Sequence, residues 1–292
     1  MTTQQVPKLQ PLKGTRILSL ALNLPGPAAL MRLRVMGARC LKLEPPSGDP
    51  MRHYKPEAYE ALHHGIRVKA ADLKTEAGQR VLHQELAKAD VLLTSFRPSA
   101  LTKLGLNWKA LHKQYPQLSQ VVIVGSLGER AEEPGHDLTY LADVGLVTGL
   151  DLPATLYADM GGSLMASEAV LQVVMHTQRT GKGACVEVAL ASAAGYLALP
   201  RAWGLTTPGA AIGGGHAGYR IYPCKNGRVA VAALEPHFAA RLCAAAGLTL
   251  GAPQTMFKPD TQQIIAAWLL GKTRAQLDKL AAAQDIPMLT MA

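Results

Sequence analysis

The chain has 292 residues, of which 48% are hydrophobic and 17% charged, a composition typical of a globular protein rather than a disordered one. Lys and Arg outnumber Asp and Glu by 30 to 21, which gives a formal net charge of +9. No Lys/Arg-rich run carries interleaved aromatic residues, so a nucleic-acid partner is not expected, and the excess charge favours a small phosphorylated molecule.

The cysteines and the N-terminus indicate the compartment. Cys40, Cys185, Cys224 and Cys243 lie far apart and form no CxxC pair, so we expect reduced thiols and no metal site. The first fourteen residues, MTTQQVPKLQPLKG, are polar and contain no apolar leader segment. No apolar run is long enough to span a membrane. We therefore expect a cytoplasmic protein with no membrane partner.

Strand and helix patterns alternate along the first two thirds of the chain. Strands are expected at 16–22, 39–44, 90–96, 120–127 and 184–190, and helices at 25–38, 75–89, 98–115 and 161–180. This alternation predicts an α/β fold with a parallel sheet covered by helices on both faces, whose ligands bind beyond the carboxyl ends of the strands. Residues 51–71 show no clear pattern. Their histidines His53, His63 and His64 have no acidic partner at ligand spacing, so we interpret them as surface or packing residues.

The last third of the chain has a different character. Residues 204–218 are rich in glycine and carry no charge, so we place a boundary here, between domains 1–205 and 206–292. Beyond it the sequence predicts a hairpin with Asn226 and Gly227 at its turn, followed by helical segments. The second domain is therefore expected to be a smaller α+β unit.

One stretch, from residue 134 to residue 162, concentrates acid–base side chains. It opens with His136 and Asp137 and closes on Asp159, just before a helical pattern. An aspartate in this position is most often a helix N-cap, and the alternative is a site residue stabilised by the free N–H groups of the helix start. His136 and a carboxylate could transfer a proton, or Asp159 could attack an activated acyl group. Glu235 is a further candidate, and spacing alone does not choose between these chemistries.

Six sequence blocks together resemble a known family in its own order. They include GTRILSLALNLPGPAALMRLRVMGARCLKLEPPSGDPMR, DLKTEAGQRVLHQELAKADVLLTSFRPSALTKLGL, GHDLTYLADVGL, ADMGGSLMASEAVL, RTGKGACVEVAL and YRIYPCKNGRVAVAALEPHF. In these blocks the chain resembles the class III CoA-transferase family, also called the carnitine dehydratase/bile-acid-inducible group. This family includes alpha-methylacyl-CoA racemases. The resemblance implies a Rossmann-like CoA-binding domain, a small second domain and an interlocked homodimer. The sequence ends before the C-terminal stretch that members of this family usually have.

The resemblance also implies roles for the acidic residues. In the transferases, the residue matching Asp159 attacks an acyl-CoA thioester and forms covalent intermediates, after which a carboxylic acid accepts the CoA. In the racemases, the residues matching His136 and Asp159 exchange a proton at the substrate α-carbon, and the residue matching Glu235 orients the histidine. Asp137 stands beside His136 in either case. Transferase is the leading interpretation, racemase the second, and a catalytically weak CoA-binding protein the third.

The CoA contacts are inferred from the same resemblance. The DLK block places Leu73 and Lys74 near the nucleotide, and Phe96 and Arg97 follow a strand where the family holds adenine and phosphates. Lys103 and Arg52 are further phosphate-binding candidates, and each of these charges could instead be a solvated surface residue. Acyl-CoA is expected as a substrate, with no permanently bound cofactor and no metal.

Overall fold

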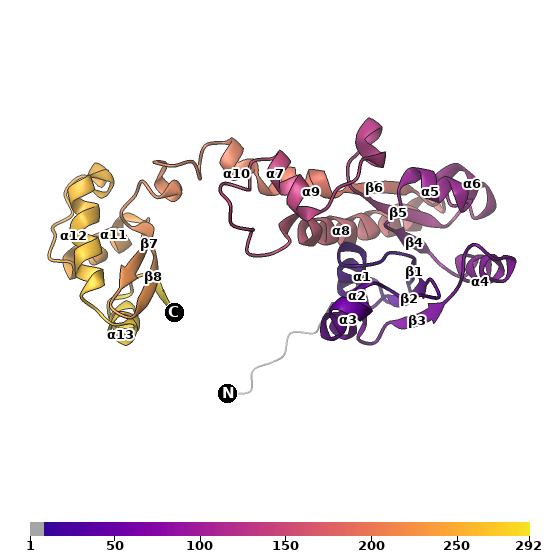
Figure 1. Cartoon of the computed structure of the whole chain (residues 1–292), viewed down its shortest axis with the longest axis horizontal. Helices are drawn as coiled ribbons and strands as arrows, with labels where there is room; N and C mark the ends of the chain where they lie inside the picture. The colour runs from indigo at the N-terminus through magenta and orange to yellow at the C-terminus, as the bar shows by residue number, and fades with distance from the viewer. Residues whose placement is uncertain (1–8) are drawn as a thin grey trace. The chain divides into compact units, whose positions relative to one another are not determined.

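The computed structural model describes residues 9–292, which form two compact units (Figure 1). The first unit ends at Ala198 and the second runs from Leu199 to Ala292. The functional division that the sequence suggested, a CoA-binding domain at 1–205 and a small domain at 206–292, stays a prediction. No helix among the described residues is long and apolar enough to cross a membrane.

A six-stranded parallel sheet forms the centre of the first unit, as the sequence predicted. Its strands lie in the order β3-β2-β1-β4-β5-β6, so the direction of winding reverses between β1 and β4. This is the strand order of the doubly wound nucleotide-binding folds, which bind ligands at the reversal point. The bounds are β1 Arg16–Ser19, β2 Arg39–Glu44, β3 Arg67–Ala70, β4 Val91–Thr94, β5 Ser119–Val124 and β6 Cys185–Ala189.

Helices cover both faces of this sheet because successive strand residues point to opposite sides. Ile17 packs with α1 (Pro25–Val35) and α8 (Tyr157–Thr180) in one apolar core. Leu18 packs on the other face with α4 (Glu76–Leu86), α5 (Pro98–Lys103) and α6 (Trp108–Gln114). Further short elements are α2 Met51–Tyr54, α3 Pro56–His63, η1 Gly128–Glu132, α7 Asp137–Asp143 and α9 Leu190–Leu197.

At two places this unit differs from what the sequence indicated. The unassigned residues 51–71 hold α2, α3 and β3, and β3 escaped detection because this edge strand is largely exposed and carries Arg67 and Lys69 in place of an apolar run. Helix α8 begins at Tyr157 rather than at residue 161. Its N-cap is therefore Leu156, and Asp159 is not a capping residue but lies in the first turn.

The second unit is a small α+β fold, also as expected. Strands β7 (Tyr219–Cys224) and β8 (Gly227–Ala232) form the predicted antiparallel hairpin, and the unpredicted β9 (Met288–Met291) pairs with β8. Val229 and Val231 of the sheet pack against helices in a separate apolar core. The remaining elements are α10 Leu199–Ala202, η2 Ala211–Gly213, α11 Pro236–Ala245, η3 Pro253–Phe257, α12 Pro259–Leu270 and α13 Arg274–Gln284.

Candidate active site

A cavity of about 790 Å³ lies at the carboxyl edge of the parallel sheet, where the strand order reverses. Its walls include residues 22–25, which follow β1, and residues 95–97, which follow β4. The Leu22 N–H donates a hydrogen bond of 3.3 Å to Ser95 Oγ and so ties these two connections together. The cavity is thus the crevice in which folds of this strand order bind ligands.

His136, Asp137 and Asp159 all line this cavity, so the structure brings together three of the four acid–base candidates. His136 is the N-cap of α7, Asp137 opens that helix, and Asp159 lies in the first turn of α8. The Asp159 backbone N–H donates a 3.0 Å hydrogen bond to Asp137 Oδ1. Free N–H groups and the dipole at a helix start favour negative charge, and two such starts meet here.

The carboxyl group of Asp159 is a stronger base than an ordinary aspartate. Burial raises its pKa to about 6, the nearby charge of Asp137 adds to this increase, and His136 opposes it. A carboxylate with this pKa is still mostly ionised at neutral pH, yet it is poorly solvated and therefore reactive toward a proton or an acyl carbon.

The remaining walls are largely apolar and aromatic, which suits an acyl chain. Tyr140 packs closely here, because a Cβ at Gly125 or Gly135 would come within 2.3 or 2.6 Å of its hydroxyl. Burial raises the pKa of Tyr140, and Asp159 raises it further. Tyr140 was not among the residues predicted from the sequence, where its only signal was a pair of nearby glycines. Further apolar or aromatic lining residues are Leu24, Met51, Tyr54, Phe96, Ile123 and Leu190.

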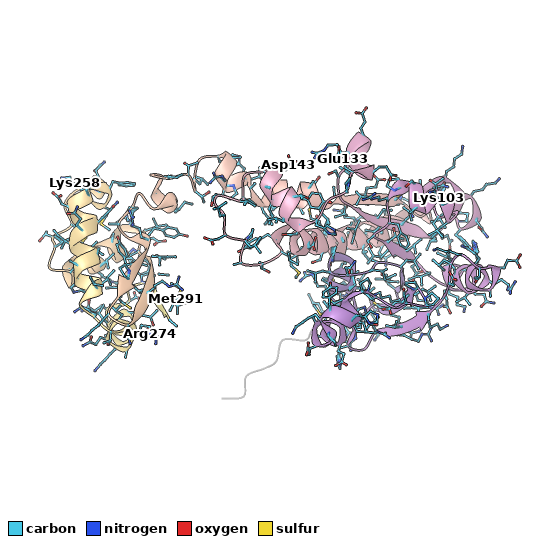
Figure 2. The ribbon with its side chains drawn as sticks, viewed as in Figure 1. Lys103, Glu133, Asp143, Lys258, Arg274 and Met291 are labelled. Atoms are coloured by element: carbon cyan, nitrogen blue, oxygen red, sulfur yellow. The ribbon has the colours of Figure 1, made fainter. Side chains whose placement is uncertain are left out.

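A second cavity, of about 880 Å³, brings together most of the residues expected to contact CoA. Leu73, Lys74 and Phe96 line it with Lys103, which lies at the end of α5 and is labelled in Figure 2. Phe96 borders both cavities, whereas Arg97 lines only the first of these two. Two exposed lysines beside a half-buried aromatic ring can hold phosphate groups and an adenine ring.

Arg52 lines neither of these cavities, and its guanidinium interacts within the chain. It donates a 2.6 Å hydrogen bond to the Tyr59 hydroxyl and lies 3.4 Å from Glu44 Oε2. The Tyr59 hydroxyl in turn donates to Glu44 Oε1 at 2.8 Å. A phosphate-binding role for Arg52 would compete with these contacts and stays a prediction.

Arg52 belongs to the edge of a buried charge cluster around Lys42, which is fully buried. The Lys42 ammonium forms an ion pair with Asp49 and lies 3.2 Å from Glu44 Oε1. It also donates a hydrogen bond of 2.9 Å to His63 Nε2. His63 is therefore a buried packing residue, one of the two expected alternatives, but it does lie beside carboxylates, which the sequence-based interpretation did not expect. Burial and the Lys42 charge lower the pKa of His63. Glu44, Asp49 and His63 have the spacing of metal ligands, and the ammonium lies among them as their cation.

This cluster fixes two walls of the first cavity. Asp49 accepts hydrogen bonds from the Asn23 N–H at 3.1 and 3.2 Å and from the Met51 N–H at 2.9 Å, and both residues line the cavity. Asn23 has φ of 62°, a left-handed conformation that side chains rarely adopt. Asp49 therefore holds the connection after β1 and the start of α2 in one arrangement.

Glu235, the fourth acid–base candidate, lies in the second unit. It is exposed and directly precedes α11, and it makes no side-chain cap to that helix. A joint role with His136 stays a prediction.

The comparisons with known proteins identify the class. The model of CoA-transferase family III matches residues 12–291, so the chain belongs to that family. The cinnamoyl-CoA:phenyllactate CoA-transferase of Clostridium sporogenes is 29% identical over 63% of this chain and 50% of its own length. The human alpha-methylacyl-CoA racemase is also 29% identical, over 81% of this chain and 65% of its own. The chain thus spans between half and about two thirds of these relatives.

Solved structures support the fold. A crystal structure of a hypothetical protein (Rv3272) from Mycobacterium tuberculosis matches 97% of this chain and 86% of its own, with a TM-score of 0.84 at 23% identity. A CAIB/BAIF family protein from Brucella suis matches with a TM-score of 0.80. The family contains both CoA transferases and racemases, and its members act on CoA thioesters.

Proposed function

We propose that this protein transfers CoA from an acyl-CoA donor to a carboxylic acid through a covalent intermediate on Asp159. The observation that carries the proposal is the placement of Asp159: its carboxyl group lines the cavity, and burial next to Asp137 raises its pKa to about 6. A poorly solvated carboxylate attacks an acyl carbon more readily than a solvated one.

The proposed reaction begins when the Asp159 carboxylate attacks the thioester carbonyl, which gives a mixed anhydride and releases the CoA thiolate. The thiolate then attacks the aspartyl carbonyl, forming an aspartyl-CoA thioester and releasing the donor acid. The acceptor carboxylate attacks this thioester and regenerates a mixed anhydride and the thiolate, which finally attacks the acceptor acyl carbon. Asp159 is returned as a carboxylate. Retaining CoA through these steps gives each attack a high effective molarity.

The second cavity supplies the proposed CoA contacts. Lys74 and Lys103 would pair with the phosphate groups, and Leu73 and Phe96 would pack against the adenine or the pantetheine arm. Since Phe96 also borders the first cavity, a thioester could extend from one cavity into the other. Arg97, which lines the first cavity, would stabilise negative charge there.

A racemase is the second candidate, and one observation favours it. His136 and Asp159 line the same cavity, and a carboxyl group with a pKa of about 6 can both take and return a proton near neutral pH. In this alternative His136 and Asp159 exchange the α-proton of an acyl-CoA. The third candidate is a CoA-binding protein with little turnover.

Trapping separates the three candidates. The protein would be incubated with acyl-CoA and hydroxylamine, and its peptides analysed by mass spectrometry for a hydroxamate at Asp159. We expect the adduct in the native chain and in Asp143→Asn, an exposed carboxylate control on α7, but not in Asp159→Asn. Deuterium incorporation at the α-carbon without an adduct would instead support the racemase. Acyl-CoA binding with neither signal would leave the CoA-binding protein.

We further propose that the protein acts in the cytoplasm as a homodimer. Large apolar side chains are exposed along α8 and α9, including Leu164, Tyr196 and Leu197. Exposed apolar patches of this kind often mark protein interfaces. Light scattering should give twice the 31.0 kDa mass of one chain, and a monomeric mass at micromolar concentration would reject the dimer.

A further inference from the structure

A group of cations lies at the amino edge of the parallel sheet, the edge opposite the candidate active site. Arg16, Arg39 and Arg67 are the first residues of β1, β2 and β3. Arg16 pairs in register with Arg39, and Arg67 pairs with Leu41. Since alternate residues of a strand share a face, Arg39 and Leu41 point to the same side, and all three arginines therefore project from one face.

These arginines line a cavity of about 530 Å³ together with Arg34 and Lys88. The acidic residue that lines the cavity, Glu85, already forms ion pairs with two lysines. Its Oε1 lies 2.8 Å from Lys69 Nζ, and its Oε2 lies 3.7 Å from Lys88 Nζ. These contacts hold the pKa of Glu85 below its ordinary value. The cavity as a whole therefore has a strong excess of positive charge.

The four arginines of the cavity form no ion pair with any residue of the described chain, 9–292. The Arg34 guanidinium lies against Gly65, so closely that a Cβ there would be 2.3 Å from its Nη2. Like charges placed opposite one another on neighbouring strands destabilise a sheet. A bound anion would remove this repulsion.

We propose that this cavity is a binding site for a small anion that carries several phosphate or carboxylate groups. Guanidinium groups bind both chemistries through paired N–H donors, and the volume suits a small molecule. None of its lining residues lines either cavity at the carboxyl edge, so the anion site is separate from the proposed CoA site. The proposal of an anion site therefore does not depend on the proposed function.

Calorimetric titration with inorganic triphosphate at low ionic strength tests the site. We expect Arg39→Gln/Arg67→Gln to weaken binding by at least about tenfold, because two charge-assisted hydrogen-bond donors are lost. The control Lys109→Gln/Arg179→Gln removes the same charge from exposed positions outside the cavity and should weaken binding less than about twofold. Thermal denaturation of each variant would verify that it is folded.

A third pair, Lys74→Gln/Lys103→Gln, reports on binding at the proposed CoA cavity. The proposal is overturned if triphosphate does not bind the native chain, if only this third pair weakens binding, or if all three pairs weaken it equally. A parallel titration with citrate distinguishes the two ligand sources: citrate binding that the first pair also weakens indicates a polycarboxylate, and triphosphate binding alone indicates an oligophosphate. Hydrogen exchange should slow in residues 39–44 and 67–70 when the anion binds.

Discussion

The backbone N–H of Asp159 donates its hydrogen bond to the Asp137 side chain, which fixes two carboxyl groups at neighbouring helix starts. Asp137 is only 4% exposed, so its charge acts on Asp159 with little screening by water. Burial of the Asp159 carboxyl group, and secondarily the charge of Asp137, thus raise its pKa to about 6 although it lies at a helix start, where an anion is normally favoured.

The first prediction concerns the pH dependence of activity. In the proposed mechanism turnover needs ionised Asp159, so kcat/KM for acyl-CoA should rise as the pH increases to about 6 and level off above it. Asp137→Asn removes a charge that raises this pKa, and the acid limb should therefore move to lower pH. A pH–rate profile measures the limb, with exposed Asp143→Asn as the control. An unchanged limb, or one moved to higher pH, would contradict the assigned role of Asp137.

A second prediction concerns stability. The folded chain binds the Asp159 proton more tightly than the unfolded chain, whose pKa is near 3.8, so this group lowers the stability as the pH rises from about 4 to about 6. Asp159→Asn removes that loss. Because the side chain is partly exposed, we expect a gain on the order of 1 kcal/mol at pH 7 and almost none at pH 4. Urea unfolding at both pH values measures it, and equal effects at both would refute it.

The third prediction concerns the buried charge cluster. Lys42→Met should cost about 3–5 kcal/mol of stability, because it leaves the buried carboxylates of Glu44 and Asp49 without their cation. Lys69→Met breaks a partly exposed pair with Glu85 and should cost at most about 1 kcal/mol. Chemical denaturation of both variants gives the comparison, and similar costs would show that the buried network is not strongly coupled.

The fourth prediction concerns the backbone at Asn23. Asn23→Ala should destabilise the chain by about 1–2 kcal/mol, because alanine lacks the tolerance of asparagine for left-handed φ. Asn23→Gly relieves that conflict and should stay within about 1 kcal/mol of the native chain. Thermal unfolding of the two variants measures the difference. Equal losses would place the cost in the asparagine side chain rather than in the backbone conformation.

The fifth prediction concerns the second cavity. Lys74→Gln/Lys103→Gln should raise KM for acyl-CoA about tenfold or more and leave KM for the acceptor acid little changed, because the acceptor has no nucleotide. The effect should shrink at high salt, which weakens such contacts in the native chain. Steady-state kinetics with Lys109→Gln as the control tests this, and a rise in both KM values would point to a general distortion.

The sequence predicted the sheet well because most of its strands are apolar runs between turn signals. The exceptions have physical reasons: β3 is an exposed edge strand rich in charge, and β9 is a four-residue strand that gains its partner from β8 far away in the sequence. The N-cap expectation for Asp159 failed because α8 begins at Tyr157, which has no capping side chain before it.

The candidate site was only partly predictable. His136 and Asp159 could be proposed together from the family resemblance, and the structure places both in one cavity. The Lys42 cluster could not be predicted, since its members come from β2, the loop after it and α3, and only the folded structure brings them together. Tyr140 could not be predicted for a similar reason, because only the folded structure shows that its hydroxyl fits where Gly125 and Gly135 leave room.

Phe96 is the one described residue that lines both the first and the second cavity, and under the proposed function this has a consequence for how the substrate range can change. Mutations of other residues of the first cavity, at Met51 or Leu190 for example, would change the shape of the proposed acyl site. They would not alter the residues of the second cavity, which are proposed to bind CoA. The range of acyl groups accepted could therefore change through single mutations, each of which retains the affinity for CoA. A mutation of Phe96 would instead alter the binding of the acyl group and of CoA together.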